Sequence, residues 1–296
     1  MHGEGPVIQY GLPILYVIFL WWFSTGAIIY LDGLPQRTYR WSMLGASVLA
    51  GIALYALALT AHQETLFGAY VAFTGAIILW GWVEMSFLMG MITGSRRSRC
   101  PEGALGWRRF IYAVQAILYH EFALIIAALA IVLVTWGGAN MVGLYTFLIL
   151  WVMRTSTKLN VFLGVRNLNE EWLPDHLRYL ESYFRKKPMN LLFPISVTAS
   201  TIVAVLIVQT AMDPSATTHQ VAGATFLAIL MILAILEHWF LVLPLPSQAL
   251  WNWALRSRQP DEAHFRPIYP TIKAANDPDK NSPSPGLTVS PSRLRY

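Results

Sequence analysis

The sequence predicts an all-α fold, a polytopic membrane bundle of about seven transmembrane helices. Of its 296 residues, 55% are hydrophobic and only 12% are charged. Several apolar runs continue for about 20 residues, the length that an α-helix needs to cross a bilayer core of roughly 30 Å. These runs are apolar on every face, which argues against a soluble globule. It also argues against a membrane β-barrel, whose strands alternate in polarity over about ten residues.

Seven spans are predicted, with residue ranges 7–31, 41–61, 66–92, 108–135, 139–160, 191–212 and 219–243. All 21 Lys and Arg residues fall in alternate connections when Arg154 and Lys158 are assigned to the connection after the fifth span. The positive-inside rule therefore predicts that the N-terminus lies outside and that the C-terminus is cytoplasmic.

Composition, connection lengths and missing motifs also argue against several functional classes. Cys100 is the only cysteine, so the chain has no intrachain disulfide and no cysteine-based metal cluster. The net charge of +5 does not indicate a nucleic-acid partner, because the charges are not gathered on one soluble face. The connections predicted to lie outside are short, which argues against a receptor with an external ligand-binding domain. The sequence contains no Walker loop, dinucleotide-binding glycine pattern, nucleophile elbow or His-Glu-x-x-His motif.

Residues 1–256 are predicted to form the transmembrane bundle, which includes a cytoplasmic amphipathic helix at about 173–187. Pro174 suits the first turn of that helix. Four apolar residues then follow at spacings of four, three and four, as one helix face requires: Leu173, Leu177, Leu180 and Phe184. We expect this helix to lie on the membrane surface. Residues 257–296 are rich in Pro, Ser, Asp and Asn and are predicted to form a disordered cytoplasmic tail.

Five ionisable side chains interrupt the apolar runs: Glu84, His120, Glu121, Glu237 and His238. A charged side chain near the bilayer centre costs about 2.5 to 3.5 kcal/mol on translocon scales, so such residues usually have a partner or a function. All five lie in the predicted cytoplasmic half, within about 10 Å of one another in depth. One explanation is a structural network in which Arg154 and Lys158 pair with the three carboxylates, or extend to the cytoplasmic surface.

Two functional explanations use the same residues. His120 or His238 could bind a cofactor as the axial ligand of a tetrapyrrole metal. Alternatively, all five side chains could hold iron or another transition metal, as mixed Glu and His sets do in bundle cores. Di-iron proteins use a Glu-x-x-His spacing, whereas here each Glu and His pair is adjacent and diverges by about 100° around its helix. A proton relay is a further alternative, and the sequence leaves all of these open.

Several strings in this chain resemble one known family. They are Trp82–Leu88, Tyr119–Glu121, Lys158–Glu171, His176–Leu180 and Tyr183–Phe184. Together they resemble the PuhE family, described as photosynthetic complex assembly protein 2 of purple and related phototrophic bacteria. The resemblance extends from about Pro6 to Arg256. It implies a multi-pass protein of the bacterial inner membrane, including the intracytoplasmic membrane, that is associated with the reaction centre H-subunit gene cluster.

The leading hypothesis from the sequence is therefore an accessory protein for assembly of the bacterial photosynthetic apparatus, the reaction centre and light-harvesting complexes. Such a protein would handle bacteriochlorophyll or its supply. Its partners would be the lipid bilayer and either photosynthetic complex subunits or pigment-synthesis enzymes, with no nucleic acid. The alternative is a membrane metalloenzyme that modifies a tetrapyrrole or another lipophilic substrate through the Glu and His residues. A scaffold without a ligand is the third possibility, and enzymatic turnover is left open.

Overall fold

A computed structural model describes residues 7–168, 173–245 and 247–258. This part of the chain is helical, and its one β-type pairing is an isolated bridge between Val165 and Lys186. The all-α class predicted from the sequence is confirmed. The predicted disordered tail lies outside the described residues from position 259 onward, so its disorder stays a prediction.

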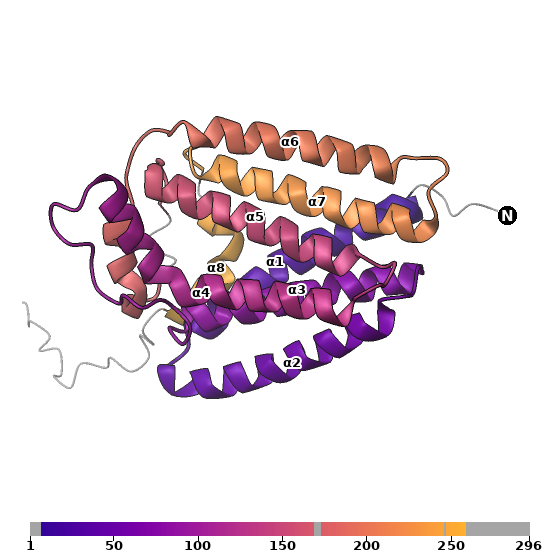
Figure 1. Ribbon diagram of the computed structural model, residues 1–296, viewed down its shortest axis with the longest axis horizontal. Coiled ribbons are helices and arrows are strands. Elements are labelled where there is room, and N and C mark those ends of the chain that lie inside the picture. Colours follow the sequence, from indigo (N-terminus) through magenta and orange to yellow (C-terminus); the bar gives the residue numbers. More distant parts are fainter. Residues whose placement is uncertain (1–6, 169–172, 246, 259–296) are drawn as a thin grey trace, which may run out of the picture. The chain divides into compact units, whose positions relative to one another are not determined.

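Seven long helices make up most of the described chain (Figure 1). Their bounds are α1 Leu12–Asp32, α2 Tyr39–Thr60, α3 Leu66–Leu88, α4 Gly106–Val134, α5 Val142–Leu163, α6 Leu192–Ala211 and α7 Thr218–Phe240. A π-helical turn, Val7–Gly11, precedes α1. The shorter segments are the 3-10 helices Gln36–Thr38, Asp175–Tyr183, Ser247–Trp251 and Arg256–Arg258, and α8, Asn252–Leu255.

Six of the seven long helices, all except α5, are long and apolar enough to cross a membrane by length and composition. Helix α5 carries Arg154 and Lys158 in its second half, and it packs against α3, α4 and α7. Helix α5 therefore contacts protein on several sides, and both of its charged residues form ion pairs there, Arg154 with Glu84 and Lys158 with Glu121. The predicted total of seven spans and the predicted orientation stay predictions.

Helices α3 and α7 form the centre of the bundle. Within their most apolar windows 50% and 61% of residues are buried, compared with 17% in α1 and α6. Figure 1 shows α6 lying along α7, and α2 along α3. The outer helices expose large apolar side chains, among them Leu15, Tyr55, Ile126 and Ile195. An apolar surface of this extent suits lipid rather than water.

The connections that carry Lys and Arg meet at one end of the bundle, which we call the basic end. There His176 Nε2 lies 2.8 Å from the Leu88 carbonyl oxygen, which joins the α5–α6 connection to the end of α3. The segment after α7 also returns to this end, where Arg258 pairs with Asp32 at 2.6 Å. The connections with Lys and Arg, which alternate along the sequence with connections that lack them, thus lie together at one end of the bundle.

The short connections meet at the opposite end, which we call the neutral end. The backbone N–H of Asn140 donates to the Ala61 carbonyl, and the His219 ring lies 3.1 Å from the Thr65 carbonyl oxygen. Helix α7 begins there with a capping box, in which Thr217 and Gln220 each accept from the other's backbone N–H.

The third span ends at Leu88, four residues earlier than predicted. Gly90 has a φ of +75°, a conformation that favours glycine, and it turns the chain back on the end of α3. The N–H groups of Met91 and Ile92 both donate to the Ser86 carbonyl. The apolar residues at 89–92 therefore form a turn, although their composition resembles that of the helix.

The segment predicted to form an amphipathic helix at about 173–187 contains a helix of the 3-10 type, Asp175–Tyr183. Its buried residues, Leu177, Leu180 and Tyr183, recur every three positions, as a 3-10 helix requires. They pack with Phe87 and Ala116 at the ends of α3 and α4. After Tyr183 the chain extends, and backbone bonds to Val161 and Val165 hold it along the end of α5.

The chain after α7 folds back on α1, which the sequence did not predict. Trp22 donates its indole N–H to the Leu250 carbonyl, and Trp251 donates to the Trp22 carbonyl. Described structure therefore continues to Arg258, two residues beyond the predicted boundary of the bundle.

Candidate functional site

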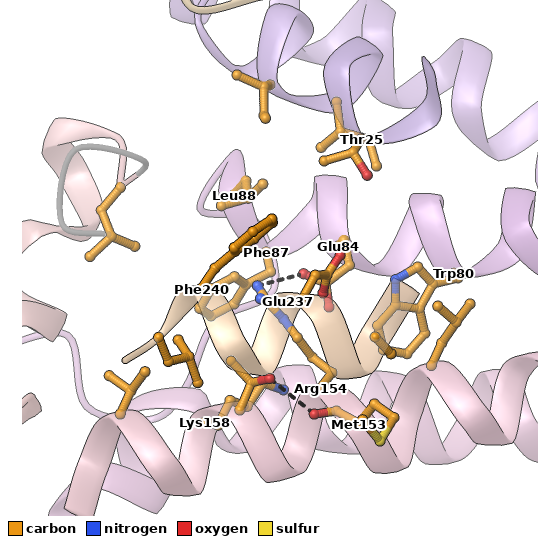
Figure 2. A pocket seen from close by; sticks show the side chains of 18 of the residues that line it. Thr25, Trp80, Glu84, Phe87, Leu88, Met153, Arg154, Lys158, Glu237 and Phe240 are labelled. Carbon is orange, nitrogen blue, oxygen red and sulfur yellow. Dashed lines mark hydrogen bonds and ion pairs between the residues drawn. The ribbon is translucent and has the colours of Figure 1, made fainter. Parts of the chain in front are cut away.

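A cavity of about 400 Å³ lies among α1, α3, α4, α5 and α7, in the half of the bundle nearer the basic end. Most of the side chains that line it are apolar or aromatic. Four are acidic or basic: Glu84, Arg154, Lys158 and Glu237. Figure 2 shows Glu84, Arg154 and Glu237 gathered in one part of the cavity, with Trp80 and Phe87 beside them. This size and lining are typical of small-molecule sites.

Small residues leave the space open. Gly81 lines the cavity from α3, and a Cβ added to it would meet nothing closer than Ile28 Cδ1, at 3.5 Å. Ala113 of α4 and Ala234 of α7 line the same space. Because none of these side chains fills the gap between the helices, the longer charged side chains of α5 can reach into it.

Glu84 and Arg154 form the ion pair at the centre of the site. Glu84 Oε2 lies 3.2 Å from Arg154 Nη2, and Glu84 is buried. The side chain of Arg154 is 42% exposed, and it lines the cavity. Arg154 donates no hydrogen bond to any other described residue. Part of its guanidinium group is therefore available to a molecule in the cavity.

His120 lies next to this pair but does not line the cavity. It is completely buried, and its ring packs on Phe87 with the ring centres 4.5 Å apart. Its Nε2 lies 3.7 Å from Glu84 Oε1, which is too long for a hydrogen bond. Neither ring nitrogen of His120 has a hydrogen-bond partner among the described residues, and Glu84 Oε1 has none either. Buried polar atoms without partners are rare and are often functional.

The backbone of His120 is fixed by the loop after α3. The N–H of His120 donates to the Thr93 carbonyl, and the N–H of Arg96 donates to the Gln115 carbonyl. Gly94 makes this close contact possible, because a Cβ there would lie 2.1 Å from the Gln115 oxygen. The loop is thus held directly against α4 beside the buried imidazole.

Glu121 and Lys158 form a second ion pair, at 2.7 Å, and Lys158 also lines the cavity. Glu237 has a different kind of partner. Its Oε1 accepts the indole N–H of Trp21 at 2.7 Å, and it forms no ion pair with a described residue. The structural network, one of the explanations that the sequence left open, paired all three carboxylates with Arg154 and Lys158. That is right for Glu84 and Glu121, whereas the partner of Glu237 is Trp21.

His238 faces away from the cavity and is buried. Its Nδ1 lies 2.9 Å from the Ala234 carbonyl oxygen, and its Nε2 lies 2.9 Å from Ser156 Oγ. Both ring nitrogens are therefore engaged. The divergence expected of adjacent pairs is seen, since Glu237 lines the cavity and His238 does not.

The structure brings together only part of the predicted set. Glu84 and His120 are neighbours, whereas Glu121, Glu237 and His238 each have separate partners. Within the described part of the chain, no three His, Cys, Asp or Glu side chains are arranged so that they could hold a metal ion. The predicted metal and cofactor roles stay predictions, which elemental analysis and absorption spectra of the purified protein would test.

Sequence reasoning missed Trp21 and Gly81. Trp21 lies in an apolar run and carried no signal of its own, and a carboxylate without a cation elsewhere in the spans was the only sign that an indole N–H was needed. Gly81 gave no signal, because a glycine inside an apolar helix looks the same whether it permits close packing or leaves a void.

The family described as "Protein of unknown function (DUF3623)" matches residues 7–262. This chain belongs to that family. A curated protein of Rhodobacter capsulatus, "Uncharacterized 30.4 kDa protein in puhA 5'region", is 40% identical to the chain over 262 residues. The alignment covers 87% of this chain and 95% of that relative. No solved structure matches. Every described residue of the cavity lies inside the range that the family matches.

Proposed function

We propose that this protein is an accessory protein of the bacterial inner membrane for assembly of the reaction centre and light-harvesting complexes. One observation carries the proposal: the chain is 40% identical, over nearly its whole length, to a protein whose name places it in the puhA 5' region. The resemblance to the PuhE family supports it further, because that resemblance implies the reaction centre H-subunit gene cluster. The apolar outer surface supports a membrane location.

The cavity suggests what such a protein does during assembly. A space with apolar walls and a few ionisable groups, enclosed by membrane helices, can hold a lipophilic component before it is delivered. In this proposal the partners are photosynthetic complex subunits or pigment-synthesis enzymes. Contact with a pigment-synthesis enzyme would bring this protein to the source of the lipophilic component. Contact with complex subunits would bring it to the recipient.

Bacteriochlorophyll is the pigment that the proposal concerns. His238 has both ring nitrogens engaged, and His120 is separated from the cavity by Glu84 and Phe87. Axial ligation by either imidazole therefore requires these neighbours to rearrange. His120→Ala and His238→Ala test it, with the exposed His62→Ala at the neutral end as the matched control. Loss of co-purified pigment in one of the first two variants alone would support ligation.

The assembly role is tested by deleting the gene in a phototrophic host and supplying the wild-type gene in trans. We expect the near-infrared bands of the assembled complexes to fall by more than about half per cell and to recover on complementation. Complementation in trans separates this effect from altered expression of neighbouring genes. Wild-type levels of both complexes in the deletion strain would overturn the proposal.

A further inference from the structure

Arg154 is a hydrogen-bond donor that lines the cavity. A guanidinium group carries five N–H donors, and among the described residues Arg154 uses one contact, to Glu84 Oε2. With 42% of its side chain exposed, the group faces the cavity. N–H donors left without acceptors in apolar surroundings are costly. An oxygen atom of a bound molecule would satisfy them, so the site is suited to a ligand with an exposed acceptor.

Two carboxylates, Glu84 and Glu237, and two cations, Arg154 and Lys158, line the cavity. Among the described residues, Arg154 pairs with Glu84 at 3.2 Å and Lys158 pairs with Glu121 at 2.7 Å, so both cations already have a carboxylate partner. An anionic ligand at Arg154 would meet the carboxylate of Glu84, and a cationic ligand would meet Arg154 itself. Like charges repel strongly in surroundings of low dielectric constant, so a neutral ligand is favoured.

The rest of the cavity lining indicates what the body of the ligand must be like. The walls around the charged groups are apolar and include Trp80, Phe87, Leu150, Leu230 and Phe240. A fully polar small molecule would bury its polar groups against these apolar walls without hydrogen-bond partners. It would also have to cross the apolar bundle to reach the cavity. A lipophilic molecule can enter from the bilayer and gains roughly 25 cal/mol for each Å² of apolar surface buried.

We propose that the cavity binds a neutral lipophilic molecule whose polar end carries a carbonyl oxygen, and that Arg154 donates hydrogen bonds to that oxygen. Glu84 holds the guanidinium group in place, and Glu237 lies near enough to accept from a donor next to the carbonyl. This inference deepens the proposed function and rests on it for the biological role of the ligand.

The test uses the full-length protein in nanodiscs and four probes with the same carbon chain: 2-dodecanone, dodecanoate, dodecylamine and dodecane. Binding is measured by equilibrium dialysis with radiolabelled probe, and empty nanodiscs give the lipid background. We expect saturable binding of the ketone, and binding of the other three probes weaker by about tenfold or more, because they lack the neutral carbonyl.

Arg154→Met should weaken ketone binding by about tenfold or more, which is the usual effect of losing a hydrogen bond from a charged group. Arg178→Met is the matched control, since Arg178 is an exposed arginine outside the cavity. The double variant Glu84→Gln/Arg154→Met removes both partners and leaves no unpaired carboxylate if the single variant folds poorly. Gly81→Leu should weaken binding of every probe, because the added side chain occupies part of the cavity.

Three results would overturn the inference: dodecanoate binding as tightly as the ketone, unchanged ketone binding in folded Arg154→Met protein, or no saturable binding by the folded wild-type protein. The assembly role is measured separately in the deletion strain. A protein that binds no ketone while its deletion still prevents assembly would refute the ligand class alone. Ketone binding together with normal assembly in the deletion strain would refute the assembly role alone.

Discussion

The central helices α3, α5 and α7 pack differently in the two halves of the bundle. In the half near the neutral end, a Cβ added to Gly75 would lie 3.2 Å from Leu57 Cγ and 3.4 Å from the Ala53 carbonyl oxygen. Six residues further along α3, Gly81 faces the cavity with Ile28 Cδ1 at 3.5 Å as its nearest neighbour. One helix therefore uses glycine for close packing in one half and for open space in the other.

Polar groups show the same contrast. Near the neutral end, Asn140 donates to the carbonyls of Thr60 and Gly68, and the Thr225 hydroxyl donates to the Val221 carbonyl. Thr146 is an exception there, because its hydroxyl has no partner among the described residues. Near the basic end, Glu84 Oε1 and both ring nitrogens of His120 lack partners beside a cavity. Most of these polar groups in the packed half have partners, whereas the polar atoms without partners at the candidate site lie in the half with the cavity.

The largest effect is expected for leucine at the two glycines of α3. Gly75→Leu should lower the free energy of unfolding by about 3 kcal/mol, because overpacking a closely packed core forces neighbouring groups to shift. Gly81→Leu should change it by less than about 1 kcal/mol, since the added side chain enters the cavity and both positions gain similarly in helix propensity. SDS titration of the purified variants, followed by circular dichroism, measures both values.

Equal destabilisation by the two leucines would contradict the division into a packed half and an open half. It would mean that the bundle closes around Gly81 in the membrane. Both substitutions lie on α3 and replace glycine with leucine. The two variants therefore differ only in where the leucine is placed.

A smaller effect is expected for the ion pair at the site. Removing one partner of a buried pair costs about 3 to 5 kcal/mol. For Glu84→Gln we expect about 1 to 2 kcal/mol, because the side chain of Arg154 is 42% exposed and the amide oxygen of glutamine still accepts a hydrogen bond. A double-mutant cycle with Arg154→Met measures the coupling between the two side chains. A coupling near zero would mean that the surroundings screen the attraction between Glu84 and Arg154 as strongly as water does.

The fold could be predicted from the sequence to within a few residues at most helix ends. Apolar length alone places α4, predicted at 108–135 and observed at Gly106–Val134, because the bilayer fixes how long such a run must be. Local backbone conformation was harder to predict. The turn at Gly90 is apolar, and the segment Asp175–Tyr183 has a stripe that suits either an α-helix or a 3-10 helix.

The site could be predicted only as a set of unusual residues. Depth along each helix follows from residue counting, so the location of Glu84 and His120 at similar depth was foreseeable. Which helices are neighbours is not encoded in any short stretch. Trp21 and Glu237 are 216 positions apart, and their contact depends on α1 lying against α7. The cavity itself depends on the missing side chain at Gly81 and the small side chains of Ala113 and Ala234, which no motif records.

The smallest effect is expected for an ion pair outside both halves of the core. Asp175 and Arg178 lie 2.9 Å apart at the start of the 3-10 helix at the basic end, with side chains that are 94% and 62% exposed. Asp175→Asn should change the free energy of unfolding by less than about 0.5 kcal/mol, because exposed ion pairs gain little in water and lose side-chain entropy. The same SDS titration measures the change at low and at high salt. A loss as large as that of Glu84→Gln would show that this helix is anchored by charge, whereas we attribute its anchoring to the burial of Leu177, Leu180 and Tyr183.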